Sequence, residues 1–229
     1  MKQLTIIILF ALISIKNYSQ QGGTLYVGEN FMNNYRNVLI NTSKNYSGEN
    51  IKGNPFTTDD FVLGKVIGYK NNYLLKYDAF SEQMLAKRRD DTVVIVNKET
   101  ITEVTFNDGT KYVVFDYIFD GAKKNGYLEV LLSNSAISLL KKEVIKFIPA
   151  QKPATGYDQP KPPAFKKMRD RYLISNTKGE INSFSKKKDF LQLFPDRKNE
   201  IEKFISSNKI KLTKEKDLIK LIKHINSSL

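Results

Sequence analysis

The stretch 61–148 constrains the fold most, because it alternates short runs of β-branched and aromatic residues with turn residues. The runs recur about every 8 to 12 residues, which is typical of an antiparallel all-β unit. Asn71-Asn72 and the Asn-Asp-Gly turn at 107–109 supply residues that tolerate positive φ, as tight hairpins require. The pattern predicts strands at 61–69, 73–77, 83–87, 92–97, 101–106, 111–119, 127–133 and 137–147.

A meander of this kind must curl into a barrel or half-barrel, or fold over as a sandwich, to bury one face and hide its edges. Before it, the 29–40 stretch has apolar residues at the spacing of an amphipathic helix. We therefore expect the α+β class: an antiparallel β-meander, as a barrel, half-barrel or curled sheet, with an N-terminal helix and a basic C-terminal helical module.

The second half of the chain changes composition at residues 149–163, which hold five of the seven prolines. Such a segment is stiff and extended, and it indicates a boundary. The expected organisation is a signal peptide at 1–19, a β-rich domain at 20–148, a proline-rich linker at 149–163 and a basic, mainly helical module at 164–229. Within this module the sequence predicts a small hairpin at 172–174 and 180–184. Helices should follow from Ser185, Pro195 and Thr213, with Asn208 as a left-handed stop.

The first twenty residues read as a secretory signal peptide. Lys2 precedes an apolar run at 4–15, and polar residues follow it at 17–20. A helix that spans the hydrocarbon core needs roughly 20 apolar residues, so this run is short for an anchor. We expect cleavage after Ser19 or Gln20, a periplasmic or secreted protein, and no integral membrane span after cleavage.

The positive charge is concentrated in the last third of the chain. Residues 151–229 carry 19 basic and 9 acidic side chains, whereas the whole chain has a net charge of +13. One interpretation is an electrostatic footprint for a polyanion such as an anionic envelope lipid, polysaccharide or nucleic acid. The other is a lysine-rich solvated surface, because charge alone specifies no partner.

Basic and aromatic residues interleave at 161–172, in a pattern that suits an anionic surface. The alternative interpretation is that Phe165, Met168 and Tyr172 form the buried side of a helical turn, since their spacing is three and four. The candidate contacts for an anionic surface are Lys166, Lys167, Arg169, Arg171, Lys186, Lys187 and Lys188.

Several kinds of chemistry are excluded by composition. The absence of cysteine removes disulfides, thiolate metal sites and cysteine nucleophiles. His224 is the only histidine, so triads and multi-histidine metal centres are excluded, and its place near the chain end suits a helix-dipole contact. We assign no catalytic residue, no cofactor and no metal. The 195–226 stretch is similar in pattern to a DNA-binding helix pair, but an exported protein meets no genome, so we expect no nucleic acid partner.

Two carboxylates without other groups can hydrolyse glycosides. Asp116 and Glu129 form the most plausible pair, although simple strand alternation could point either one to solvent. The other acidic candidates lie mostly at turns, where aspartate commonly makes local hydrogen bonds: Asp78, Asp120 and the pairs Asp59-Asp60 and Asp90-Asp91.

Four short stretches carry a resemblance: 73–78 (YLLKYD), 156–158 (GYD), 204–209 (FISSNK) and 217–220 (DLIK). Together they resemble uncharacterised exported proteins of Gram-negative bacteria, a group that implies no activity for any residue here. A meandering sheet backed by a helix also looks like periplasmic lipoprotein carriers, as an analogy of architecture only.

The combined expectation is an exported, non-enzymatic binding or cell-envelope-associated protein, whose partner is an anionic envelope lipid or polymer. Two alternatives stay open. The first is a periplasmic lipid or small-molecule carrier, suggested by the many aromatic residues of the sheet. The second is a carboxylate-dependent hydrolase of envelope carbohydrate.

Overall fold

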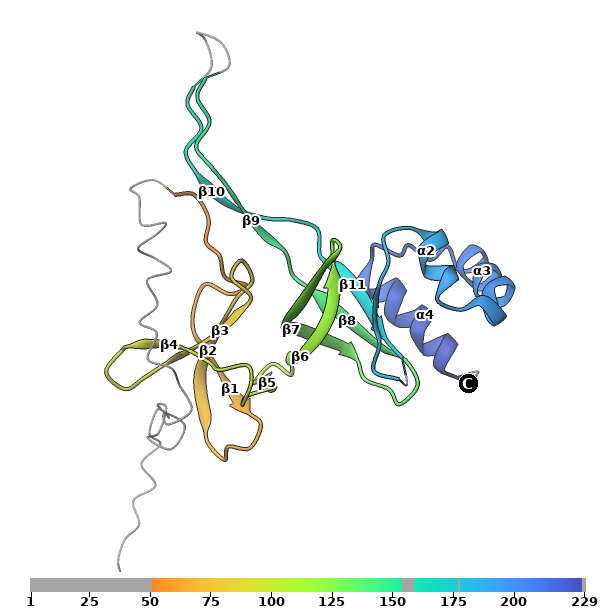
Figure 1. Cartoon of the computed structure of the whole chain (residues 1–229), viewed down its shortest axis with the longest axis horizontal. Coiled ribbons are helices and arrows are strands. Elements are labelled where there is room, and N and C mark those ends of the chain that lie inside the picture. The colour runs from red at the N-terminus through yellow and green to blue at the C-terminus, as the bar shows by residue number, and fades with distance from the viewer. Residues whose placement is uncertain (1–50, 154–158, 177, 228–229) are drawn as a thin grey trace, which may run out of the picture.

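The computed structural model describes residues 51–153, 159–176 and 178–227. The expected signal peptide and the expected helix at 29–40 lie outside the described residues. The α+β class is confirmed: a curled antiparallel sheet is accompanied by a group of helices near the C-terminus (Figure 1).

The main sheet contains ten strands in the order β12-β11-β8-β7-β6-β5-β1-β2-β3-β4, and β9 and β10 form a separate pair. The strands are β1 (Val62–Val66), β2 (Asn72–Asp78), β3 (Gln83–Lys87), β4 (Val93–Ile95), β5 (Glu103–Phe106), β6 (Lys111–Phe119), β7 (Ala122–Leu132), β8 (Ser138–Lys142), β9 (Ile145–Ile148), β10 (Ala164–Lys167), β11 (Arg171–Ser175) and β12 (Ile181–Ser183). All of these strands pair antiparallel, and β12 curls back to lie against β6.

Two details of the predicted meander are wrong. Strand β5 pairs with β1 rather than with β4, so the meander is interrupted once. Strand β7 begins at Ala122, not at 127, because Asp120 and Gly121 both take positive φ (48° and 79°). Two successive residues of positive φ make a tight two-residue hairpin, and β6 and β7 therefore pair along their whole length.

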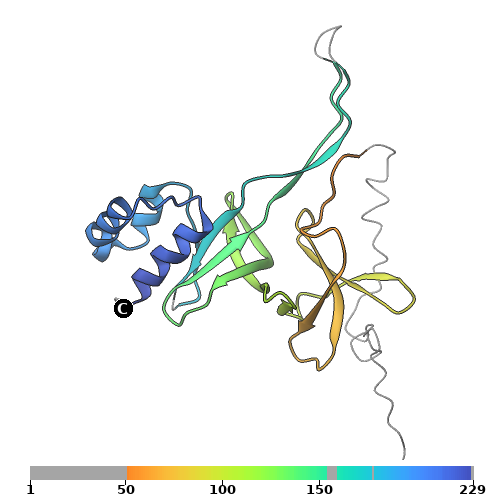
Figure 2. The ribbon, with the colours of Figure 1, turned by 180° about the vertical axis from the view of Figure 1, so that it is seen from behind.

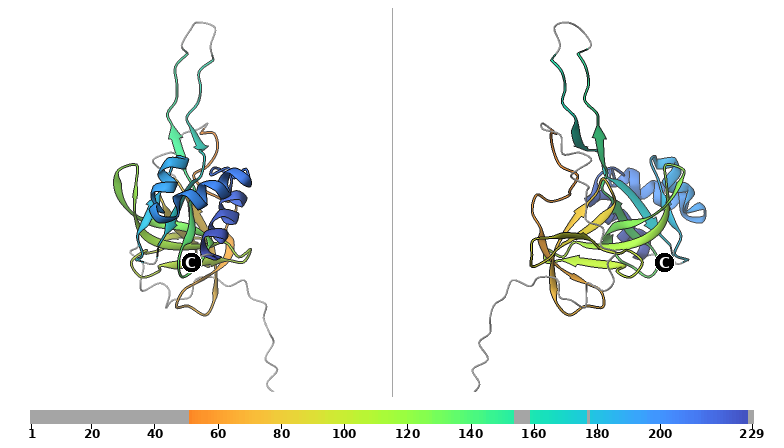
Figure 3. Two further views of the ribbon diagram at one scale, coloured as in Figure 1. Left: turned by 90° about the vertical axis from the view of Figure 1, so that its right-hand side faces the viewer. Right: turned by 60° about the vertical axis from the view of Figure 1, so that its left-hand side comes forward.

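A long two-stranded arm replaces the single strand predicted at 137–147. The chain passes from β8 to β9 at residues 143–144, and β10 returns along β9 before β11 pairs with β8. Of the segment expected as a linker, the described residues 149–153 and 159–163 extend the arm outward, and Gln151 pairs with Lys161 there. Figures 2 and 3 show the arm projecting away from the rest of the molecule.

The helical turn considered for Phe165, Met168 and Tyr172 is a wrong interpretation. Phe165 lies on β10 and Tyr172 on β11, with Met168 between these strands and 38% exposed. Pairing with β9 and β8 keeps this segment extended, and the Phe165 ring packs against Phe147 and Phe80 at centroid distances of 5.3 and 5.2 Å.

The helices lie on one face of β8 and β11. They are α2 (Lys187–Gln192), the short 3-10 helix η1 (Pro195–Arg197), α3 (Lys198–Ser207) and α4 (Glu215–Ser227). Lys186 rather than Ser185 is the N-cap of α2, and α4 begins two residues after Thr213. The left-handed residue after α3 is Lys209 (φ 52°), not Asn208 (φ −96°).

Three apolar cores follow from this topology. The first lies among β1 to β6 and β7 and includes Tyr77, Tyr112 and Tyr127. The second, which we call the inner core, lies inside the curl of β6, β7, β8 and β11 and is built on Tyr117, Leu128, Leu140 and Leu173. The third joins the outer face of β8 and β11 to the helices, through residues such as Leu139, Ile174, Phe190, Ile201 and Leu221.

A buried ion pair joins the two halves of the sheet. Glu82, in the turn between β2 and β3, accepts a hydrogen bond from the Tyr117 hydroxyl (2.9 Å) and lies 3.0 Å from the Lys142 ammonium. Gly126 permits this approach, because a Cβ there would come within 2.8 Å of the Glu82 carboxylate. The Lys142 side chain is only 4% exposed, so its pairing with Glu82 holds β8 against the β2–β3 turn.

The root of the arm is fixed by Glu143. Its carboxylate accepts a hydrogen bond from the buried Tyr112 hydroxyl of β6 (2.6 Å) and lies 3.3 Å from the Lys167 ammonium of β10. One side chain thus connects the main sheet to both sides of the arm at its base.

The first prediction concerns the Glu82–Lys142 pair. Lys142→Met should lower the free energy of unfolding by about 3 kcal/mol, because the Glu82 carboxylate stays half-buried without its cation. The Glu82→Gln/Lys142→Met double variant should recover most of this loss, and Lys124→Met should have little effect, since Lys124 is exposed and 3.9 Å from Glu82. Urea denaturation of the four proteins checks this, and equal losses for Lys142→Met and Lys124→Met would contradict it.

The second prediction concerns pH. Burial, the largest single effect, raises the pKa of Glu82, but the attraction and hydrogen bond of Lys142, the hydrogen bond from Tyr117 and the attraction of Lys124 together outweigh it. The pKa of Glu82 is therefore lowered from its ordinary 4.5. A lowered pKa stabilises the fold above pH 4.5, and this stabilisation is lost as the pH falls through the folded-state value. The free energy of unfolding should therefore fall more steeply below pH 4.5 for the wild type than for the Glu82→Gln/Lys142→Met variant. Denaturation curves at pH 6 to 3 measure the difference, and parallel slopes would refute it.

Candidate functional site

The basic residues singled out from the sequence lie in two separate places. Lys166 and Lys167 are on β10, Arg169 follows it and Arg171 begins β11, whereas Lys186, Lys187 and Lys188 lie at the start of α2. The arm and α2 are well separated in Figure 1. The structure thus divides the predicted contacts into an arm group and a helix group.

Two members of the arm group make local ion pairs. Lys167 pairs with Glu143, as described above, and Arg171 lies 3.6 Å from Asp120 and 5.7 Å from the centroid of the Phe119 ring. These contacts link the base of the arm to the sheet, so they give Lys167 and Arg171 a structural role.

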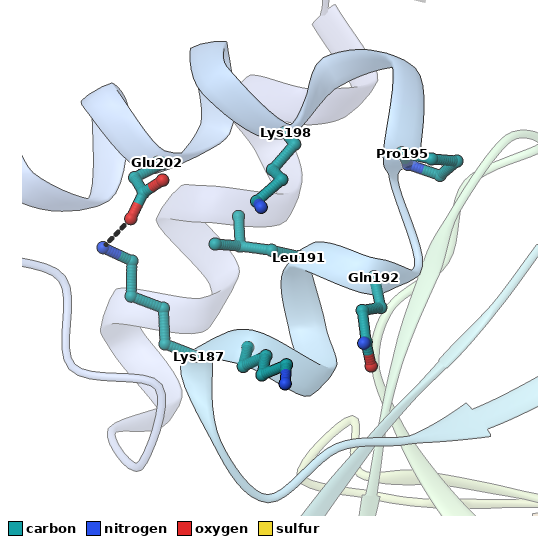
Figure 4. A pocket seen from close by; sticks show the side chains of 7 residues that line it. Lys187, Leu191, Gln192, Pro195, Lys198 and Glu202 are labelled. Atoms are coloured by element: carbon teal, nitrogen blue, oxygen red, sulfur yellow. Dashed lines mark ion pairs between the residues drawn. The ribbon is translucent and has the colours of Figure 1, made fainter.

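Two members of the helix group, Lys187 and Lys188, border a groove of about 490 Å³ between α2 and α3. This volume lies within the roughly 300 to 1,000 Å³ that is typical of ligand pockets. Figure 4 shows the side chains that line it. The lining residues are Lys187, Lys188, Leu191, Gln192, Pro195, Lys198 and Glu202.

Local sequence explains why the groove forms. Helix α2 ends at Gln192, and Pro195 then begins η1, where a proline is favourable because its missing N–H would have no partner there. The chain turns between α2 and α3, which places Lys198 opposite α2. The inner sides of both helices are fixed by the buried residues Phe190 and Ile201 of the helical core.

Only one of the three lysines that line the groove forms an ion pair with another described residue. Lys187 spans it to an ion pair with Glu202 at 2.8 Å, and the hydrogen bond from Lys187 lowers the pKa of Glu202. Within the part of the chain that the structure describes, neither Lys188 nor Lys198 has an acidic group within 4 Å. Lys198 attracts Glu202 from beyond 4 Å and helps to lower its pKa, but Glu202 is ion-paired with Lys187. Lys188 and Lys198 therefore stand without an ion pair of their own in the described chain. They lie above the apolar surface of Leu191 and Pro195, an arrangement suited to binding an anion.

Sequence reasoning found Lys187 and Lys188 of this groove but missed Lys198, Gln192 and Glu202. Lys198 lies ten residues after Lys188 and comes near it only through the packing of two helices. The predicted helix start at Pro195 was the one local signal for this turn.

The structure does not bring Asp116 and Glu129 together. Asp116 is opposite Asn125 in the β6–β7 ladder and accepts its amide hydrogen bond (2.8 Å), whereas Glu129 is opposite Tyr112, four positions away. Four strand residues span roughly 13 Å, more than the roughly 5 to 9.5 Å between paired glycosidase carboxylates. Burial raises the pKa of Glu129, and Lys141 pairs with it at 2.6 Å.

The remaining acidic candidates make local contacts. Asp78 accepts hydrogen bonds from the backbone N–H groups of Phe80 and Ser81, and Asp90 accepts one from that of Thr92. Asp59 accepts a hydrogen bond from the Asn54 amide. These contacts are typical of turn aspartates.

His224 is on α4 and packs against α3. Its ring stacks on Phe204 with centroids 3.8 Å apart and planes 7° apart, and Nε2 lies 3.3 Å from Glu200. These contacts place the only histidine in helix packing.

Buried side chains of the first core and of the inner core occupy the interior of the curled sheet. Tyr77, Tyr127, Leu128, Leu140 and Leu173 are each at most 1% exposed. The geometry therefore gives no support to a carrier that holds its ligand inside the curl.

Within residues 51–153, 159–176 and 178–227, no group of three or more acidic or histidine side chains is placed to hold a metal ion. Helices of that part are too short or too polar to span a membrane.

Comparison with protein-family models, with curated proteins and with solved structures finds no match to this chain. The site therefore has to be interpreted from its own geometry, which is that of a small basic groove with an apolar floor between two helices.

Proposed function

We propose that this protein is an exported, non-enzymatic binding protein that associates with an anionic lipid or polymer of the cell envelope. One observation carries the proposal: Lys188 and Lys198 face a groove with an apolar floor, and no acidic group lies within 4 Å of either among the described residues. The leader-like first twenty residues support export.

The electrostatics of the helical module support an anionic ligand. Residues 151–229 have ten more basic than acidic side chains, which attracts polyanions over a range set by salt. Exposed lysines near an anionic surface contribute about 1 kcal/mol each. Lys188 and Lys198 would therefore give the groove a measurable share of the binding.

The groove chemistry supports binding rather than catalysis. Its polar groups are three ammonium groups, one carboxylate already paired with Lys187, and the Gln192 amide. Such groups bind and orient an anion, and the one carboxylate is held ionised by its hydrogen bond.

The third prediction tests export. When the full chain is expressed in a Gram-negative host, the protein in the envelope fraction should begin at Gln20 or Gln21, because cleavage is expected after Ser19 or Gln20. Intact-mass measurement of the purified protein identifies the terminus. A mass that includes Met1 would contradict export by this leader.

The fourth prediction tests the groove. Lys188→Glu/Lys198→Glu should weaken binding to phosphatidylglycerol vesicles about tenfold or more at low salt, because two attractive charges become repulsive. Wild-type binding should itself fall steeply between about 50 and about 200 mM salt. Co-sedimentation measures both effects.

A matched control is Lys70→Glu/Lys123→Glu, which changes the net charge equally at exposed positions far from the helices in sequence. This control should lose much less binding than the groove variant. Equal losses would show a general charge effect, and wild-type binding that does not change with salt would overturn the proposal.

A further inference from the structure

The outer face of the arm gathers lysines from three neighbouring backbone segments. Lys146 of β9 and Lys166 of β10 are directly opposite each other in the antiparallel register. Lys52 forms a parallel bridge with Ala164, two residues before Lys166. All three lysines are exposed.

The register places these side chains on one face. Directly paired residues point to the same side of a sheet, as do residues two apart along a strand. Lys146 and Lys166 therefore have Cβ atoms about 5 Å apart, and Lys52 lies diagonally from Lys166 at about 7 to 8 Å. We call these three residues the lysine triad.

The other face of the arm has a different composition. Phe147 and Phe165 lie there and pack together with Phe80, while Lys167 turns to Glu143. The arm therefore has one face attached to the body. On its other face, Lys146 and Lys166 are the only charged groups of β9 and β10, and Lys52 lies beside them on the segment bridged to β10.

The triad lacks acidic neighbours on the arm. The described arm residues 144–153 and 159–169 include six basic and no acidic side chains. Like charges directly opposite in a sheet are destabilising. An anion placed between Lys146 and Lys166 would remove this repulsion, so the arm has a free-energy reason to bind one.

The backbone of the triad is already ordered. The Lys52 N–H donates to the Pro163 carbonyl (3.0 Å), and the Phe165 N–H donates to the Lys52 carbonyl (2.8 Å). Three positively charged side chains on fixed backbones need less ordering on binding than three on a loop.

We propose that the lysine triad binds a phosphate group, either free or as the headgroup of an envelope lipid. This site is separate from the α2–α3 groove and does not depend on the function proposed for it. Charge-assisted hydrogen bonds from three ammonium groups match the several oxygens of a phosphate.

The test uses the mature chain carrying Lys188→Glu/Lys198→Glu, so that the groove does not contribute. Inorganic phosphate should raise its thermal midpoint more than chloride at equal ionic strength. Lys166→Glu should raise the midpoint without phosphate, because it pairs with Lys146, and should lower the apparent phosphate affinity about tenfold or more.

Lys146→Gln is a second variant, and inorganic phosphate should no longer raise its thermal midpoint more than chloride does. Lys123→Glu, at an exposed position of β7 opposite Ile118, is the matched control and should keep the phosphate response. Binding to vesicles with and without phosphatidic acid distinguishes free phosphate from a lipid headgroup. A response both to inorganic phosphate and to phosphatidic acid vesicles indicates that any phosphate group binds. Binding to the vesicles alone indicates a headgroup. A phosphate response that survives both triad variants, or the absence of binding in both assays, would overturn the proposal. Failure of the groove experiment alone would leave it intact.

Discussion

The fold depends on the continuous pairing of β6 with β7. This ribbon is the longest in the sheet, and it contributes Tyr112 and Tyr127 to the first core and Tyr117 and Leu128 to the inner core. Because neighbouring residues of a strand face opposite sides, adjacent pairs such as Tyr127 and Leu128 serve different cores. The first core and the inner core are therefore both built on the backbone hydrogen bonds between β6 and β7. The Glu82–Lys142 ion pair adds a second link, between the β2–β3 turn and β8.

Local signals predicted most of the strands. The 83–87 and 111–119 strands were placed at their observed bounds, and the hairpin of β11 and β12 was found from its turn. Long-range pairing was not predictable in this way. Nothing near β5 indicates β1 as its partner, and the 165–172 spacing suited a helix until β9 and β8 supplied partners for an extended chain. Whether a segment forms a strand depends on the neighbours with which it pairs in space, and local periodicity carries no information about those neighbours.

The same distinction applies to the candidate site. The run Lys186 to Lys188 was visible in the sequence as a charge cluster, but Lys198 joins it only through the contact of α2 with α3. Lys166 was identified as a candidate, whereas Lys52 and Lys146 were not, since they are distant in sequence and meet it only through strand register. A run of charged residues can thus be identified from the sequence, whereas a cluster of charges from different strands or helices can be identified only once the fold is known.

The position of Glu143 has a mechanical consequence. Because it contacts Tyr112 of the main sheet and Lys167 of the arm, any tilting of the arm must stretch a buried hydrogen bond. Breaking such a bond is costly where water cannot replace the partner. The base of the arm is therefore coupled to the first core, and displacing it would disturb the packing of Tyr112 there.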